Sequence, residues 1–370
     1  MTTGADATRP ATILLDLDGT LADSAPGILG SYRRALIALG HEPDPDFDMN
    51  FVIGPVMADV MPHVLAHYGD DRVEEAIALY RHYYGEAGLF QAQLYPGMAQ
   101  LLKALSAAGC RLFLATAKRV EFAEQMLEHF GITALFEGIY GSVAGNALDH
   151  KKDLIAHILE RADADPADVV MVGDRRYDIS GAHANGVRAL GVLWGYGGRA
   201  ELEQAGADAL AATVAELEVL LLGSLVRAAG REDLDGIMQL YRSFPSYNPD
   251  YDARAAGPDW DMIQAQPGMT VVVAEVDGVI VSSCMLAVIP NITYRGQPWA
   301  MVENVITHPD WRCRGLGNRV LAFAASLAWE AGCFKVGMMT TSKREATLRF
   351  YEGAGFRRST KTYLERRRRR

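Results

Sequence analysis

The six residues Asp16-Leu17-Asp18-Gly19-Thr20-Leu21 constrain the fold of this chain more than any other stretch. They follow the apolar run from Ala11 to Leu15, which is typical of a buried strand, and they precede a helical pattern. Because the strand turns into a loop at Gly19, both carboxylates can face one site. We therefore expect an acidic loop at the carboxyl end of the first strand. The alternative is an ordinary strand followed by an acidic turn.

A pair of carboxylates in a dry cleft favours a hard cation with oxygen ligands, typically Mg²⁺. One carboxylate can attack phosphorus while the other handles the proton of the leaving oxygen. The string DLDGTL resembles motif I of the haloacid dehalogenase-like hydrolases, a phosphatase superfamily with an aspartyl nucleophile. The resemblance implies that Asp16 attacks phosphorus, and that Asp18 protonates the leaving alcohol and later activates water.

The bulk composition is that of a globular protein with more than one domain. A chain of 370 residues with 49% hydrophobic and 22% charged residues favours two domains, each with a sizeable core. The formal net charge of −10 argues against general nucleic-acid binding. The run Arg366 to Arg370 is a basic tail, either solvated or in contact with an anionic surface.

The termini and the cysteines indicate a cytoplasmic protein. Residues 1 to 10 are small and polar, which predicts a flexible N-terminus without a signal core, and no run of about 18 apolar residues indicates a membrane span. No CxxC spacing occurs, so neither a zinc site nor a disulfide framework is expected. The four cysteines are Cys110, Cys284, Cys313 and Cys333.

A helical pattern follows the acidic loop, and the resemblance implies a small helical cap over about 22–94. Three helices are expected, each ended by a glycine: Ala25 to Leu39, Val56 to Tyr68, and Val73 to Tyr84. Gly54-Pro55 is either a plain turn or a substrate contact. No lysine lies between Leu21 and Leu102, which disfavours the cap-lysine Schiff base of the related phosphonoacetaldehyde hydrolases.

Two further residues are candidates for binding phosphate. The strand Arg111 to Ala115 ends in Thr116, whose hydroxyl can bond a phosphoryl oxygen, and LFLATAKR resembles the second motif of the family. An ammonium beside the nucleophile would neutralise charge. The spacing to Leu154-Ile155 favours Lys151 as the match to motif III, with Lys152 as a solvated neighbour.

The continuous apolar strand Val169 to Val172 ends in Gly173-Asp174, and GDRRYD resembles motif IV. The resemblance implies that Asp16, the Asp18 backbone carbonyl and Asp174 hold Mg²⁺. Asp178 has three open roles: a metal ligand, a partner of the metal's waters, or a group that orients Lys151. Many relatives carry an acidic residue in place of Arg176.

The stretch Arg188 to Asp208 resembles the closing segment of phosphoglycolate-phosphatase-like members, and we expect it to close the sheet. The resemblance covers residues 11–222. It implies an α/β fold with a Rossmann-like, doubly wound parallel sheet.

A different pattern begins after Gly223-Ser224. It predicts a strand Leu225 to Ala229, a helix Glu232 to Phe244, a hairpin of Val271 to Val276 and Val279 to Val288 turning at Asp277-Gly278, and a strand Pro298 to Val305. A helix from Asn318 to Ala331, a strand Phe334 to Thr340 and a helix from Arg344 complete it.

The decisive stretch in this half is the loop Arg312-Cys313-Arg314-Gly315-Leu316-Gly317 before the long helix. A glycine-containing, arginine-flanked loop that opens a helix presents N–H groups to an anion such as a pyrophosphate. It is not the dinucleotide-binding fingerprint, because it follows a hairpin series rather than a βαβ unit. The loop matches the R-x-x-G-x-G pattern of the GCN5-related N-acetyltransferases, and Phe350 to Phe356 resembles their closing motif.

This second resemblance covers about 225–365, within a domain expected at 223–365, and implies an α+β domain with a mostly antiparallel sheet. Acetyl-CoA would be the acyl donor, with pantetheine at the backbone near Val305 and Ile306 and the pyrophosphate at Arg312 to Gly317. Tyr351 either protonates the leaving thiolate or packs under the last strand. Glu303 either acts through water as a base or is a structural hydrogen-bond partner. Ser342-Lys343 stands where the family often has an asparagine.

The two halves together predict a bifunctional cytoplasmic enzyme, an Mg²⁺-dependent phosphatase fused to an acetyl-CoA-dependent N-acyltransferase. Its partners would be a small phosphorylated metabolite and a small amine, and the fusion suggests one metabolite that carries both groups. The alternative is a phosphatase regulated by a non-catalytic acyl-CoA sensor. A protein-acetylating regulator with a vestigial phosphatase fold is disfavoured by the intact acidic set. The oligomeric state is open.

Overall fold

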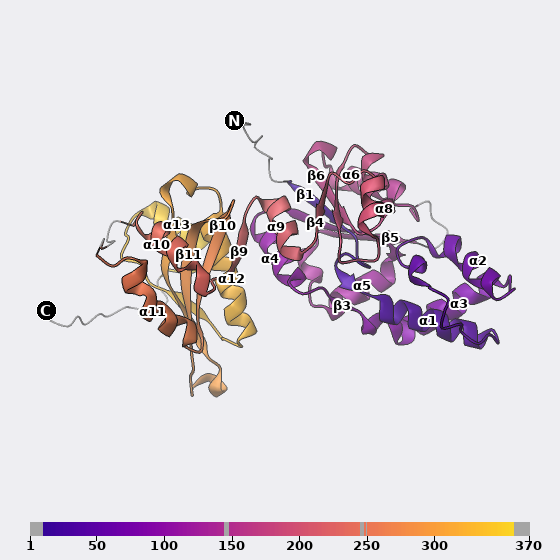
Figure 1. The fold of residues 1–370 in the computed structure, drawn as a ribbon, viewed down its shortest axis with the longest axis horizontal. Helices are drawn as coiled ribbons and strands as arrows, with labels where there is room; N and C mark the ends of the chain where they lie inside the picture. Colours follow the sequence, from indigo (N-terminus) through magenta and orange to yellow (C-terminus); the bar gives the residue numbers. More distant parts are fainter. Residues whose placement is uncertain (1–9, 144–147, 245–247, 249, 359–370) are drawn as a thin grey trace. The chain divides into compact units, whose positions relative to one another are not determined.

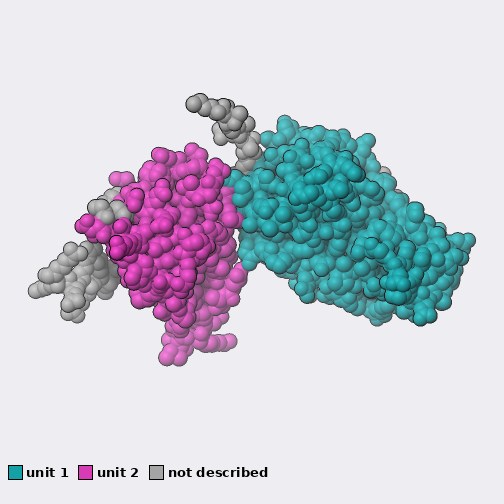
Figure 2. Space-filling model, viewed as in Figure 1, with its two compact units in different colours: residues 1–223 teal, residues 224–370 magenta. Residues whose placement is uncertain are grey.

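The computed structural model describes residues 10–143, 148–244, 248 and 250–358. They form two compact units that divide after Gly223, coloured separately in Figure 2. The basic tail Arg366 to Arg370 and all but the last residue of the expected flexible N-terminus lie outside the described residues.

The first unit is built on a six-stranded sheet in the order β5-β4-β1-β6-β7-β8, and every neighbouring pair in it is parallel. Its strands are β1 (Thr12–Leu15), β4 (Arg111–Arg119), β5 (Gly138–Ser142), β6 (Val169–Gly173), β7 (Arg188–Val192) and β8 (Ala209–Ala211). The first strand, β1, therefore lies in the middle of the sheet, and the acidic loop leaves it there.

Both faces of this sheet are buried, because alternate residues of a strand point to opposite faces. Ile13 and Leu15 of β1 pack in one apolar cluster with α4 (Met98–Ala107), α5 (Val120–His129) and α9 (Val214–Leu222). Leu14 packs in a second cluster with α6 (Lys151–Ala162), α7 (Arg176–His183) and α8 (Arg199–Gln204). The prediction of a doubly wound parallel sheet is confirmed.

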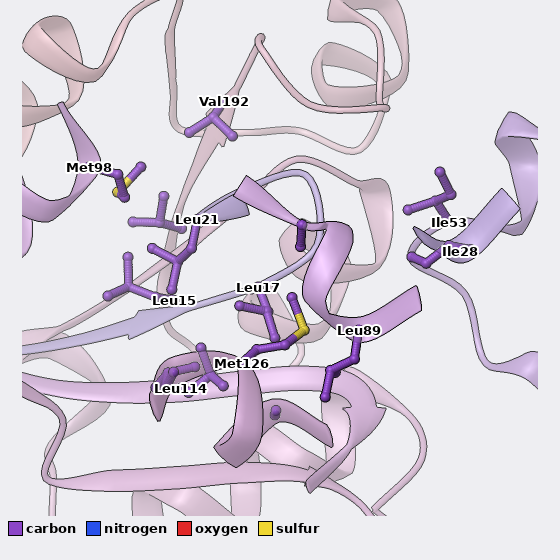
Figure 3. Packing of buried hydrophobic residues seen from close by; sticks show 14 of the residues in the cluster. Leu15, Leu17, Leu21, Ile28, Ile53, Leu89, Met98, Leu114, Met126 and Val192 are labelled. Atoms are coloured by element: carbon purple, nitrogen blue, oxygen red, sulfur yellow. The ribbon is translucent and has the colours of Figure 1, made fainter. Parts of the chain in front are cut away.

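The acidic loop is anchored in the first of these clusters. Leu17, between the two aspartates, and Leu21 are both fully buried, as is Leu15. Figure 3 shows these three leucines among the packed side chains of the cluster. Burial of Leu17 on the inner side leaves the flanking carboxylates to face the edge of the sheet.

Three helices form a separate group beside the sheet (Figure 1). They are α1 (Ala25–Ala38), α2 (Met57–His67) and α3 (Val73–Glu86). The chain enters the group through β2 (Ala22–Asp23) and leaves it through β3 (Gln93–Leu94), and these two short strands pair antiparallel. This group, residues 22–94, is called the cap below.

The second unit has a five-stranded sheet in the order β13-β12-β11-β10-β9. Its strands are β9 (Leu225–Ala228), β10 (Met269–Val276), β11 (Val279–Ile289), β12 (Trp299–Thr307) and β13 (Val336–Met338). All pairs are antiparallel except β12 with β13, so the predicted mostly antiparallel sheet is confirmed.

Helix α12 (Leu316–Glu330) and α13 (Glu345–Gly353) pack in one apolar cluster of this unit. Helices α10 (Leu234–Tyr241) and α11 (Ala253–Ala265) contribute to a second cluster. Short 3₁₀ turns occur in both units at Asn50–Val52, Gly88–Gln91, Thr133–Leu135, Pro166–Asp168, Arg231–Asp233, Tyr294–Gly296 and Pro309–Trp311. Within the described ranges, no helix combines the length and the apolar character needed to cross a membrane.

Candidate active sites

The register of the parallel sheet brings the predicted phosphatase residues to one edge. Leu15 of β1 pairs with Leu114 of β4 on one side and with Val172 of β6 on the other. Asp16 follows Leu15 directly, and Thr116 and Asp174 lie two residues beyond their paired positions. The carboxyl ends of parallel strands form the usual site edge of such folds.

Close approach at this edge depends on Gly19. Its φ of +85° is a left-handed conformation that suits glycine, and an added Cβ would lie 2.2 Å from a carboxylate oxygen of Asp174. A side chain at this position would therefore displace Asp174 from the loop. This requirement gives a structural reason for glycine after the second aspartate.

Lys151, the first residue of α6, is buried among the acids. Its Nζ donates to Asp16 Oδ1 at 2.7 Å and to the Ala115 carbonyl at 2.6 Å, and lies 2.6 Å from Asp178 Oδ1. The first two contacts are hydrogen bonds and the third is an ion pair, so three oxygens hold the ammonium in place. Burial alone would lower the pKa of Lys151, but the charges of Asp16 and Asp178 outweigh it and raise this pKa. Lys151 is therefore a fixed positive charge beside Asp16.

Asp16, Asp174 and Asp178 form a compact acidic group, with one oxygen from each residue within 4.8 Å of the others. Burial raises the pKa of Asp16 to about 7 despite the opposing charge of Lys151. Burial, followed by the charges of Asp16 and Asp178, raises the pKa of Asp174 to about 8. Burial and mutual repulsion therefore outweigh the single positive charge of Lys151, and the oxygen donors of the group are those that Mg²⁺ prefers. The residues fit a divalent cation.

Two residues that the sequence analysis did not single out hold Asp174. The backbone N–H of Tyr196 donates to Asp174 Oδ2 at 2.7 Å, and the Thr20 hydroxyl donates to Oδ1 at 3.4 Å. The Tyr196 phenol donates to Asp23 at 2.8 Å and accepts N–H bonds from the start of α1. The segment expected only to close the sheet thus also orients an acid of the site.

Asp178 is placed to orient Lys151, one of its three open roles. In addition, its Oδ2 accepts the Arg175 N–H at 3.1 Å. The Arg175 side chain pairs with Glu201 at 3.0 Å and donates to the Ile53 carbonyl of the cap. Arg176 is exposed, and its guanidinium lies over the Tyr177 ring.

Asp18 and Thr116 complete the predicted set. Both residues are buried, and the Thr116 hydroxyl accepts the Lys118 N–H at 3.2 Å, so its own proton remains available to a ligand. Asp18 Oδ2 lies 2.9 Å from Lys118 Nζ, while Oδ1 has no hydrogen-bond partner in the described part of the chain. The strand predicted to end at Thr116 continues to Arg119, and this extension carries Lys118 to the site.

The acidic edge opens into a pocket of about 120 Å³ between the sheet and the cap. Asp16, Asp18 and Thr116 line one side of it. Gly54 and Pro55 also line the pocket. This position favours a substrate contact over a plain turn, the two interpretations of this pair. Three aromatic residues of the cap also line the pocket: Tyr32, Tyr80 and Tyr84.

The raised pKa values predict a pH-dependent effect of Mg²⁺ on stability. The pKa values of Asp16 and Asp174 lie above the ordinary aspartate value of 3.8, so the folded protein binds more protons than the unfolded chain at intermediate pH. The stability that these groups contribute is present at low pH and is lost as pH rises through about 7 to 8. A cation that binds the ionised acids should restore it.

We therefore expect a Mg²⁺ concentration of about 100 times the Kd at pH 8.5 to raise the melting temperature of the first unit by about 5–10 °C at that pH. The same concentration should raise it by much less near pH 5.5. Differential scanning calorimetry of the full chain measures both shifts. Asp174→Asn should remove most of the effect. Equal shifts at both pH values would contradict the assignment of these acids to the cation.

The second predicted site lies where two strands of the second sheet separate. Strand β12 pairs with β13 only through Ala300, Met301 and Val302, although it continues to Thr307. Val305 and Ile306 therefore lie on a stretch whose β13-facing edge has no strand partner within the described ranges. Asn304 has a φ of +52°, and the pairing of β11 with β12 shifts register opposite it.

The arginine-flanked loop directly precedes α12. Arg312 Nε donates to the Thr307 carbonyl at 3.1 Å, and the Arg314 guanidinium lies 4.6 Å from the centre of the Trp311 ring. Cys313 and Gly315 have φ values of +62° and +79°. Leu316 and Gly317 form the first turn of α12, where N–H groups and the helix dipole favour an anion.

Tyr351 on α13 and Glu303 on β12 are both half-buried. Burial is the main cause that raises the pKa of Tyr351, so its phenol keeps its proton at neutral pH. Tyr351 also packs in the apolar cluster with Phe350 and Phe356. Among the residues with described positions, no hydrogen bond or ion pair involves the Glu303 carboxylate. Both interpretations of each residue remain compatible with this arrangement.

Comparison with known families gives one match for each unit. A family model described as "Haloacid dehalogenase-like hydrolase" matches residues 13–192. A model described as "Acetyltransferase (GNAT) family" matches residues 234–356. A predicted phosphatase of known structure from Clostridium acetobutylicum is 34% identical, with a TM-score of 0.55, over 58% of this chain and 99% of its own.

Curated relatives match the first unit. Tyrosine-protein kinase PtkA of Mycobacterium tuberculosis is 40% identical over 51% of this chain, which spans only 64% of that relative. A 5′-nucleotidase of Pseudomonas aeruginosa is 37% identical over 53% of this chain and 88% of its own length. A phosphoglycolate phosphatase of Cupriavidus necator is 31% identical over 56% of this chain and 92% of its own.

Proposed function

Since the chain belongs to the haloacid dehalogenase-like hydrolase family and carries a GNAT acetyltransferase domain, we propose that it is a bifunctional enzyme. One site hydrolyses phosphomonoesters through an aspartyl-phosphate. The other transfers an acetyl group from acetyl-CoA to a small amine. The observation that carries the hydrolase assignment is the buried acidic group around Lys151, with Asp18 facing the same pocket.

In the first step, a carboxylate oxygen of Asp16 attacks phosphorus while the bond from phosphorus to the leaving oxygen breaks. Asp18 Oδ1 gives its proton to that oxygen, so a neutral alcohol departs. Thr116 donates its hydroxyl proton to a phosphoryl oxygen. Lys151 neutralises charge beside Asp16, to which it donates a hydrogen bond, and binds a phosphoryl oxygen together with Thr116.

In the second step, Asp18 takes a proton from water, and the water oxygen attacks phosphorus of the aspartyl-phosphate. The bond from phosphorus to Asp16 breaks, inorganic phosphate leaves, and Asp18 is protonated again for the next cycle. Such transfers depend on positioning and charge neutralisation more than on covalent chemistry of the protein. The rigid sheet edge and the fixed Lys151 charge provide both.

Asp16, Asp174 and the Asp18 backbone carbonyl are proposed to hold Mg²⁺, with Asp178 as a further ligand or as the partner of Lys151. The ion would supply positive charge between the nucleophile and the phosphoryl group. The compact acidic group and the raised pKa values of Asp16 and Asp174 support this proposal.

In the second unit, the loop Arg312 to Gly317 is proposed to bind the pyrophosphate of acetyl-CoA, and the open edge near Val305 and Ile306 its pantetheine. Glu303 would accept a proton from the amine through water, and Tyr351 would protonate the departing thiolate. The unpaired state of Glu303 among the described residues and the retained Tyr351 proton support these roles.

The names of the relatives suggest substrates for the first site. A nucleotidase and a phosphoglycolate phosphatase both release phosphate from small esters, which favours a small phosphorylated metabolite. The GNAT match favours a small amine acceptor. We propose that one metabolite carrying both a phosphate and an amine serves both sites, and that the protein acts in the cytoplasm.

A panel of phosphorylated amines, each assayed for phosphate release and for transfer of radiolabelled acetyl groups, tests this function. We expect Mg²⁺-dependent phosphate release and acetyl transfer, with at least one compound used by both sites. If the two sites act only on separate compounds, the proposal of a shared metabolite is wrong. Acetyl-CoA binding that changes the phosphatase rate, without transfer to any amine, would replace the transferase with a sensor domain.

A further inference from the structure

Lys118 is a buried cation between the sheet and the cap that the mechanism above does not use. Its side chain is 6% exposed. Its Nζ lies 2.9 Å from Asp18 Oδ2 and donates to the Tyr84 hydroxyl at 2.7 Å. The ammonium also lies 4.4 Å from the centre of the Tyr84 ring. A buried charge needs such partners to remain stable.

The two partners come from different parts of the first unit. Asp18 belongs to the loop after β1, and Lys118 is the last residue but one of β4. Tyr84 belongs to helix α3 of the cap. The Tyr84 hydroxyl donates onward to Met126 Sδ of α5 at 3.6 Å, so its position is fixed from both sides. One ammonium therefore connects the cap to the acid–base residue.

The contact also divides the two oxygens of Asp18. Oδ2 is held by Lys118, whereas Oδ1 is buried and has no hydrogen-bond partner in the described ranges. A carboxylate held by one oxygen cannot rotate freely, so the other oxygen keeps a constant direction. Asp18 also lines the pocket, where a leaving oxygen would have to receive its proton.

We propose that Lys118 is a positioning residue that holds Asp18 ready for proton transfer, and that it does so fully only while Tyr84 of the cap is in contact with it. Cap closure and protonation of the leaving group are thereby coupled. The proposal rests on the phosphomonoester hydrolysis proposed above. The ammonium also stabilises the carboxylate that remains once Asp18 Oδ1 has given its proton to the leaving oxygen.

A matched pair of substrates separates this role from a structural one. Phenyl phosphate needs a proton on its leaving oxygen, whereas 4-nitrophenyl phosphate leaves as a stable phenolate near neutral pH. The value of kcat/KM reports the steps up to departure of this group. Loss of acid positioning should therefore reduce kcat/KM for phenyl phosphate much more than for 4-nitrophenyl phosphate, whereas general damage should reduce both equally.

With the full chain and Mg²⁺, we expect Lys118→Met to lower kcat/KM for phenyl phosphate about 100-fold and Tyr84→Phe about 10-fold, since general acids contribute about 10²–10⁴-fold. For 4-nitrophenyl phosphate both losses should stay below about threefold. In the Lys118→Met background, Tyr84→Phe should add less than about twofold, because its effect passes through Lys118. Tyr83→Phe, the neighbouring tyrosine on α3 outside the pocket lining, is the matched control and should change neither substrate.

Equal losses on the two substrates, or fully additive effects of the two substitutions, would overturn the proposal. Thermal melts check that each variant folds, and Lys118→Gln replaces Lys118→Met in the cycle if the methionine variant does not fold. The result is distinct from a failure of the hydrolase assignment. If the wild type has no turnover, or if turnover survives Asp16→Asn, both the hydrolase assignment and this proposal are refuted. If turnover depends on Asp16 but the effects of Lys118→Met and Tyr84→Phe are additive, this proposal alone is refuted.

Discussion

Asp16→Asn should reduce phosphate release by about 10⁴-fold or more, because loss of a catalytic nucleophile typically costs this much or more in kcat. The amide is nearly the same size as the carboxylate but cannot form the acyl-phosphate bond. It also removes one negative charge from the buried acidic group. Steady-state assays with a small phosphomonoester and saturating Mg²⁺ measure the effect.

The fold should survive this substitution, because Lys151 keeps its contacts with Asp178 and the Ala115 carbonyl. Asp46→Asn, an exposed residue of the cap outside the pocket lining, is the matched control and should retain wild-type turnover. Acetyl-CoA binding should be unchanged in both variants. Undiminished phosphate release by a purified Asp16→Asn protein, checked for contaminating phosphatases, would remove Asp16 as the nucleophile.

Gly315→Glu should weaken acetyl-CoA binding by about 100-fold or more. Gly315 has a φ of +79°, which costs an ordinary side chain about 1–2 kcal/mol. The new carboxylate would also stand in the loop proposed for the pyrophosphate, where repulsion between unit charges costs about 1–4 kcal/mol. Isothermal titration calorimetry of the full chain with acetyl-CoA measures the change.

Gly315→Asn is the matched control, since asparagine tolerates this backbone conformation and adds no charge. No heavy atom other than its neighbours lies within 4 Å of the position of a Cβ at Gly315, so neither side chain clashes. We expect this control to lose less than about fivefold in affinity. Phosphate release should remain at the wild-type rate in both variants. No detectable binding of acetyl-CoA by the wild type would refute the transferase proposal.

The sequence predicted the phosphatase residues because they are tied to strand ends. Asp16, Thr116 and Asp174 each end or follow an apolar strand, and the parallel register aligns such ends. Lys151 was preferred to Lys152 because of its spacing to Leu154-Ile155 on the apolar face of the same helix. Local pattern, topology and the resemblance to the family motifs together therefore brought these candidate residues to one edge.

The supporting contacts could not be predicted in the same way. Lys118 meets Asp18 across 100 positions in sequence, and Tyr196 reaches Asp174 through a backbone N–H that no side-chain pattern reveals. The contact between Lys118 and Tyr84 further depends on where the cap lies over the sheet. The one available signal was the position of Lys118 two residues after Thr116, which places both side chains on the same face if the strand continues.

Helix α11 was not predicted, because it contains Gly257-Pro258, which is normally a helix-breaking pair. In the second site, the loop before α12 was evident from its glycines and arginines. The separation of β12 from β13 could not be predicted from the strands themselves, since strand length alone does not show where pairing stops.

The position of the phosphoryl group on the chain tests most directly whether Asp16 is the nucleophile. In Asp18→Asn, water activation is impaired, so a phosphoryl enzyme formed from 4-nitrophenyl phosphate should accumulate. Acid quenching followed by peptide mass spectrometry should place the phosphoryl group on Asp16, and the double variant Asp16→Asn/Asp18→Asn should carry none. A phosphoryl group on any other residue, or one retained in the double variant, would contradict the account.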